Sequence, residues 1–150
     1  IIARNLSRYQ EKSIGIIVSP HFPKDELDIL LKQYPKIRFF QNVPSIKDFI
    51  KVSKAVICTY GNTTYESMAM MKPVFIVSYL DFQLKFAEYL ENEGMVINLG
   101  YMKTMKEINS DIFDDQLLSK LNENCRNKFV TSGIENISKV LMRSINDIQD

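Results

Sequence analysis

Residues 61–66, Gly-Asn-Thr-Thr-Tyr-Glu, have the composition to hold a phosphate beside a ribose. They follow an apolar run at 55–59 and open a helical pattern, so they should form a strand-to-helix turn. The first turn of a helix presents unpaired backbone N–H groups and the positive end of the dipole, which attract anions. Glu66 lies one turn further and could accept hydrogen bonds from a ribose diol. The segment therefore indicates a nucleotide or a nucleotide-sugar.

The same residues also fit an ordinary βαβ unit without a ligand. Asn62 or Thr63 could cap the helix, and Glu66 could complement its dipole. Thr63 and Thr64 are typical cap residues, although a cap and a phosphate site do not exclude each other. Both interpretations stay open from these residues alone.

Apolar runs alternate with helical periodicity along the whole chain, which predicts one domain over 1–150 with an α/β, doubly wound, Rossmann-like fold. Helices should cover both faces of a parallel sheet, and the C-terminal part should be helical. The predicted strands are 13–19, 37–41, 55–59, 74–78 and 95–99. The predicted helices are 1–12, 24–34, 45–53, 63–71, 82–92, 114–130 and 134–148.

Composition excludes several classes of function. The formal net charge is +1 and no basic stripe with interleaved aromatics occurs, so we expect no nucleic-acid binding. No apolar run approaches the roughly 20 residues that span a bilayer, so we expect no membrane span. One histidine and two cysteines, Cys58 and Cys125, match no metal motif. We expect a cytoplasmic protein with reduced thiols and no metal.

Ligands of such sheets bind outside the carboxyl ends of the strands, which meet at one edge. This places His21, after the first predicted strand, at the same edge as residues 61–66. A lone histidine without an orienting partner is more often a surface residue than a ligand-binding one. Asp81 is expected to be the N-cap of the helix that contains Gln83. The loops at this edge are 20–22, 42–44, 60–63, 79–81 and 100–101.

An ordered set of motifs resembles the C-terminal half of GT-B-fold nucleotide-sugar enzymes. The set is a strand, Gly-Asn-Thr-Thr-x-Glu on a helix, Lys-Pro, a strand, Asp-Phe-Gln on a helix, Gly, a strand and Asn-Leu-Gly. The resemblance is closest to the UDP-sugar hydrolase of the pseudaminic-acid pathway and to the spore coat polysaccharide biosynthesis family. The lipid II N-acetylglucosaminyltransferase is a more distant relative. SPHFPKDEL and KFVTSGIENISKVL extend the likeness over almost the whole chain.

The resemblance implies a UDP-sugar ligand. No metal is required if the helix dipole and the hydroxyls neutralise the diphosphate, so we expect no cofactor. Glu66 would bind the ribose hydroxyls, the backbone and hydroxyls of Gly61, Asn62, Thr63 and Thr64 would hold the diphosphate, and Gln83 would contact the sugar. The loop that carries His21 would lie near the base or a phosphate. The chain departs from the family at Phe82, where a polar residue is usual, and at Tyr60, where serine or glycine is common.

The resemblance also implies a missing partner. In the family a first strand and a glycine-rich loop precede the helix predicted at 1–12, and the catalytic histidine lies in the N-terminal GT-B half. His21 does not match that histidine in position. The chain should therefore bind substrate as part of a hydrolase or glycosyltransferase, without turning it over alone. Self-association is a further prediction, and a non-catalytic nucleotide-binding or protein-interaction module is the alternative function.

Overall fold

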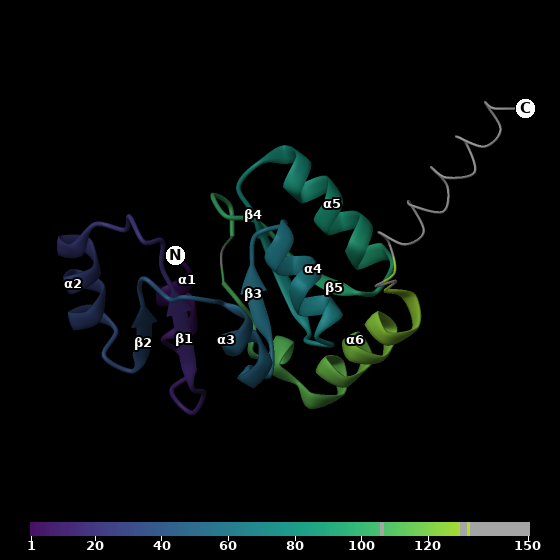
Figure 1. Ribbon diagram of the computed structural model, residues 1–150, viewed down its shortest axis with the longest axis horizontal. Coiled ribbons are helices and arrows are strands. Elements are labelled where there is room, and N and C mark those ends of the chain that lie inside the picture. The colour runs from purple at the N-terminus through teal and green to yellow at the C-terminus, as the bar shows by residue number, and fades with distance from the viewer. Residues whose placement is uncertain (106, 130–131, 133–150) are drawn as a thin grey trace, which may run out of the picture.

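Two short parallel sheets form the framework of the computed structural model, which describes residues 1–105, 107–129 and 132. Helices flank both sheets, which confirms the predicted α/β class (Figure 1). One sheet has the order β1-β2 and the other β3-β4-β5, and all pairs are parallel. The strands are β1 (Ile14–Ile17), β2 (Ile37–Phe40), β3 (Val56–Cys58), β4 (Val74–Ser78) and β5 (Val96–Tyr101).

Five of the seven predicted helices have observed bounds within two residues of the prediction. In the described part of the chain, no helix has both the length and the apolar character needed to cross a bilayer. The elements are α1 (Ile2–Leu6), α2 (Lys24–Gln33), α3 (Lys47–Val52), α4 (Asn62–Ala69), α5 (Asp81–Asn92), the 3-10 helix η1 (Ser110–Phe113) and α6 (Asp115–Lys128).

Two boundary predictions are wrong and one lies beyond the described residues. The first helix ends at Leu6 instead of continuing to residue 12, and the following turn is closed by the Ser7 hydroxyl, which donates to the Arg4 carbonyl. Asp81 is not the N-cap of α5 but its first helical residue, because Leu80 occupies the cap position. The predicted helix at 134–148 lies outside the described residues.

Strand β4 is the centre of the larger sheet. All five of its residues are buried, because β3 and β5 pair with its two edges and helices cover both faces. This explains its unbroken apolar run, Val-Phe-Ile-Val. Val74 and Ile76 point to one face, where they pack with Met68 of α4 and with Ala87 and Leu90 of α5.

The opposite face of the sheets carries a second apolar cluster. Phe75 of β4 and Ile37 of β2 belong to it together with Leu6 of α1, Ile112 of η1 and Leu121 of α6. The cluster therefore joins both sheets through one set of side chains. Helix α6 contributes to both clusters, since its Cys125 packs on the first one.

The sequence led us to expect one five-stranded sheet, and here the structure differs. In the described part of the chain no hydrogen-bonded ladder joins β1 to β3, so the strands form a pair and a triplet. Figure 1 shows β2 and β1 on one side of the molecule and β3, β4 and β5 on the other.

Asn5 fastens α1 to the segment that follows β5. Its side-chain oxygen accepts a hydrogen bond from the buried N–H of Ile108 at 3.0 Å. The Tyr9 hydroxyl donates to the carbonyl of the same residue. Both backbone groups of Ile108 are thus satisfied by α1 and the turn after it.

We predict that Asn5→Ala lowers the free energy of unfolding by about 1–3 kcal/mol, because it leaves the buried Ile108 N–H without a partner. Urea denaturation followed by circular dichroism measures this. Asn92→Ala, at the exposed end of α5, is the matched control and should change stability little. Equal stability of the two variants would contradict the role given to Asn5.

Candidate functional site

The buried hydroxyl of Thr64 shapes the turn between β3 and α4. Thr64 is fully buried. Its Oγ1 accepts a hydrogen bond from the Gly61 N–H at 3.3 Å and donates to the Thr59 carbonyl at 3.2 Å. The Thr64 N–H in turn donates to the Gly61 carbonyl. The Thr64 hydroxyl is therefore used inside the protein and is not free for a ligand.

The same bonds leave the very start of α4 open. Gly61 is the N-cap, and the N–H groups of Asn62 and Thr63 have no acceptor among the described residues. Asn62 is exposed and Thr63 is half-buried. Together with the helix dipole the two amides can hold an anionic oxygen at the carboxyl end of β3.

Glu66 lies on the same face of α4 as Asn62, because the two residues are four apart. Side chains in a helix lean toward its N-terminus, so Glu66 extends from its Cα toward the first turn of α4. It is exposed and has no hydrogen-bond or ion-pair partner in the described chain. The structure thus places three predicted site residues, Asn62, Thr63 and Glu66, on the first two turns of α4.

Gln83 makes three hydrogen bonds inside the protein that the sequence did not predict. Its Oε1 accepts hydrogen bonds from the Tyr79 and Leu80 N–H groups at 3.0 and 3.3 Å, capping α5. Its Nε2 donates to the Tyr60 carbonyl at 3.4 Å. Gln83 therefore ties the turn after β4 to the turn after β3, and in this conformation its polar atoms are occupied.

His21 lies in the loop after β1, at the edge of the other sheet. The residue is exposed, and its backbone N–H donates to the Ser19 hydroxyl at 3.2 Å. No hydrogen bond to its side chain occurs within the described part of the chain. The structure therefore does not connect His21 with the turn at Gly61.

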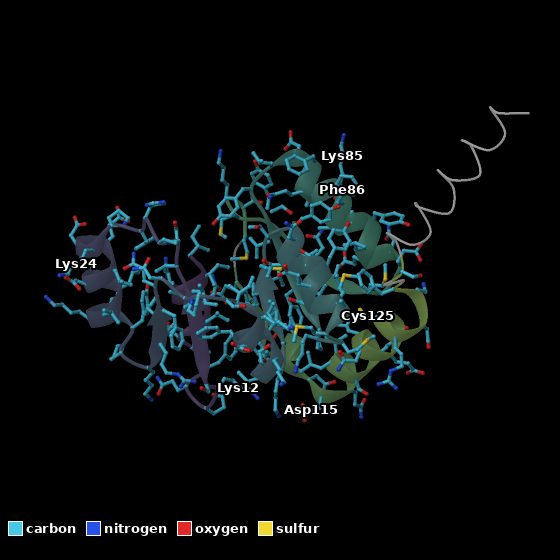
Figure 2. The ribbon with its side chains drawn as sticks, in the orientation of Figure 1. Lys12, Lys24, Lys85, Phe86, Asp115 and Cys125 are labelled. Carbon is cyan, nitrogen blue, oxygen red and sulfur yellow. The ribbon has the colours of Figure 1, made fainter. Side chains whose placement is uncertain are left out.

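An aromatic group beside the turn was not expected from the sequence. The Tyr60 ring stacks on Phe86 of α5, with centroids 4.8 Å apart, and its hydroxyl lies 2.6 Å from that of Tyr65. Burial and, after it, the hydrogen bond with Tyr60 raise the pKa of Tyr65 to about 12. Figure 2 shows Phe86 on α5 close to Lys85. The sequence did contain a signal for aromatic side chains on this helix. Phe82, Phe86 and Tyr89 are spaced by four and seven residues, which places them on one face of α5.

The two cysteines differ in exposure, since Cys125 is buried and Cys58 is half-buried. Both are free, and burial raises the pKa of the Cys58 and Cys125 thiols above the ordinary value. The residues that the structure describes contain no cluster of three or more potential metal ligands.

One hollow in the described part of the chain lies away from this turn. It has a volume of about 460 Å³ and is lined by Arg4 and Gln10 near α1, and by Tyr34 and Lys36 between α2 and β2. It lies at the amino end of β2, whereas the carboxyl ends of the strands carry the candidate site.

Comparison with known proteins leaves the function open. No family model matches the chain. The chain is similar to an uncharacterized protein of Methanocaldococcus jannaschii, with 23% identity over 158 aligned residues. That alignment covers 98% of this chain and 32% of the relative, so the chain spans about a third of the relative's length.

We predict that Gly61→Ala changes the free energy of unfolding by less than about 1 kcal/mol. The backbone of Gly61 is extended, and no heavy atom lies within 4 Å of a Cβ built there. The same methyl group would obstruct a phosphate that approaches the turn, so we expect weaker UDP binding. Gly94→Ala is the contrast, since Gly94 has φ +70° and its Cβ would lie 2.9 Å from Asn124 Nδ2. If Gly61→Ala lost as much stability as Gly94→Ala, the claim that Gly61 accepts a methyl group without strain would be wrong.

We predict that Gln83→Ala lowers the free energy of unfolding by about 1 kcal/mol, because the cap of α5 and the link to the Tyr60 carbonyl are lost together. Thermal denaturation measures the effect. Gln116→Ala, on the first turn of α6, is the control, because its N–H is capped by Asp114 and its side chain makes no such link. Unchanged stability of Gln83→Ala would leave this glutamine free for a ligand.

Proposed function

We propose that this domain binds a UDP-sugar at the turn between β3 and α4. The observation that carries the proposal is the pair of open amides at Asn62 and Thr63 with the unpartnered Glu66 on the same helical face. The amides suit a diphosphate oxygen, and the carboxylate suits a ribose diol. Uracil as the base rests on the resemblance of the motifs to GT-B enzymes.

The internal bonds of the turn support this proposal. The Thr64 hydroxyl hydrogen-bonds to the Gly61 N–H and to the Thr59 carbonyl. The Gln83 side chain on α5 donates to the Tyr60 carbonyl. The amides at the start of α4 are therefore fixed before a ligand arrives, and their orientation costs no reorganisation. Preorganised donors of this kind stabilise negative charge on a departing diphosphate.

In the intact protein we place this domain as the nucleotide-binding half of a UDP-sugar hydrolase or a glycosyltransferase. Water would attack the sugar in the hydrolase, and a sugar or lipid hydroxyl in the transferase, with UDP leaving in both. The N-terminal GT-B half would supply the base and the acceptor site. The relative from Methanocaldococcus jannaschii is long enough to hold such a half beside the matched region.

Isothermal titration calorimetry with UDP, UDP-N-acetylglucosamine and ADP tests the proposed ligand class. We expect saturable binding of the two uridine compounds and weaker binding of ADP. Equal binding of ADP would remove the preference for uracil while leaving the phosphate site in place. Absence of binding by all three would contradict the proposal.

We predict that Glu66→Ala weakens UDP binding by about 1–3 kcal/mol, the scale of lost charge-assisted hydrogen bonds. Melting temperature should hardly change, because Glu66 is exposed and unpartnered. Glu123→Ala, an exposed glutamate on α6, is the matched control and should bind as the parent does. An unchanged dissociation constant in Glu66→Ala would exclude this residue from the site.

One observation favours a second function, that of a non-catalytic protein-interaction module. Along α5 and the turn before it, large side chains are unusually open, with exposures of 51% for Tyr79, 52% for Phe82, 48% for Phe86 and 60% for Tyr89. Exposed apolar patches of this kind often mark contact surfaces. A chain that binds none of the three nucleotides would favour this function over the first.

A further inference from the structure

Helix α5 and the neighbouring part of α4 carry an exposed aromatic surface. Its members are Tyr65 of α4 and Phe82, Phe86 and Tyr89 of α5, and all four side chains are exposed. The three residues of α5 are spaced by four and three, so they line one face of that helix. Aromatic side chains gathered on one exposed face mark a contact surface.

The rings of this aromatic surface are joined through Tyr60. The Tyr60 ring stacks on Phe86, with centroids 4.8 Å apart, and meets Tyr65 edge to face at 5.8 Å. Tyr65 stacks in turn on Phe129, with centroids 6.2 Å apart. A row of rings therefore runs from α5 over α4 to the residue that follows α6.

The chain leaves α6 at the edge of the aromatic surface. Phe129 is the C-cap of α6, and Glu93 is the C-cap of α5. The Lys128 ammonium donates to the Glu93 carbonyl at 2.8 Å and pairs with the Glu93 carboxylate at 3.2 Å, which holds the two helix ends together. The chain that follows Phe129 must therefore start beside the C-terminal end of α5, about one turn from Tyr89.

The sequence after that point has the periodicity of a helix with one apolar stripe. Residues 133–150 lie outside the described residues. Within 134–148 the apolar residues recur at spacings of three and four, which places them on one helical face. They are Ile134, Ile137, Leu141, Ile145 and Ile148. An isolated helix of this length is marginal in water, so such a stripe needs an apolar surface to bury it.

The lengths of the two segments match. Helix α5 has 12 residues, which is about 18 Å at a rise of 1.5 Å per residue. A helix over residues 134–148 would measure about 22 Å at the same rise. Residues 130–133, which include Ser132 and Gly133, give a connection of the length usual between antiparallel helices.

We infer that residues 134–148 fold back antiparallel to α5 as a helix and cover the aromatic surface with their apolar stripe. Because the segment starts at the C-terminal end of α5, Ile137 would contact Tyr89 and Leu141 would contact Phe86. The inference does not rest on the proposed nucleotide site. It bears on the second candidate function, because a protein partner would have to displace this segment before it could bind the same rings.

Nuclear Overhauser effects between methyl groups and aromatic rings test the inference on the whole 150-residue chain. With the isoleucine and leucine methyl groups labelled with 13C, we expect contacts from Ile137 to the Tyr89 ring and from Leu141 to the Phe86 ring. A filtered experiment on mixed labelled and unlabelled chains separates contacts within one chain from contacts between two copies.

A pair of variants tests whether the stripe covers the rings. Leu141→Asp combined with Ile145→Asp should remove the methyl-to-ring contacts and raise the fluorescence of 8-anilinonaphthalene sulfonate several-fold, because the freed rings bind the dye. Asn136→Asp combined with Asn146→Asp adds the same charge to the opposite face of the segment and is the matched control. The control should keep both the contacts and the low fluorescence of the parent.

Three outcomes would overturn the inference. One is the absence of methyl-to-ring contacts between residues 134–148 and α5 in the whole chain. Another is contacts that occur only between labelled and unlabelled copies, which would make a second copy the occupant. The third is equal dye fluorescence in the stripe variant and its control. Nucleotide binding enters none of these measurements, so their failure is distinguishable from failure of the proposed function.

Discussion

The buried Thr64 hydroxyl is the interaction on which the candidate site depends. It accepts from the Gly61 N–H and donates to the Thr59 carbonyl, so it closes the turn between β3 and α4 from within. Because it satisfies the Gly61 amide, the next two amides are the ones left for an anion. Thr64 was predicted from the sequence to contact phosphate. In the structure its hydroxyl instead fixes the turn that carries the Asn62 and Thr63 amides.

A second layer of support comes from α5. Gln83 joins the turns after β3 and β4, and the Tyr60 ring rests on Phe86. Both contacts hold Tyr60, the residue directly before Gly61. The start of α4 is therefore fixed by its own helix and by its neighbour, while Glu66 remains free on the exposed face.

Local signals in the sequence were sufficient to predict much of the fold. The apolar run at 74–78 predicted the strand that the structure has at Val74–Ser78, and the helical pattern at 82–92 predicted α5 to within one residue. The roles of Thr64 and Gln83 could not be predicted, because both depend on carbonyl groups whose positions only the folded turn defines. Local sequence patterns also could not predict that the strands form two sheets, because strand pairing depends on residues far apart in the sequence.

The central claim is that the start of α4 binds the diphosphate of a uridine nucleotide. A titration of the 15N-labelled chain with UDP, followed by two-dimensional NMR, tests it most directly. The account predicts saturable shifts of the Asn62 and Thr63 amides, with little change at residues lining the hollow near Arg4 and Lys36. Shifts confined to that hollow, or no shifts at α4 at saturating UDP, would contradict it.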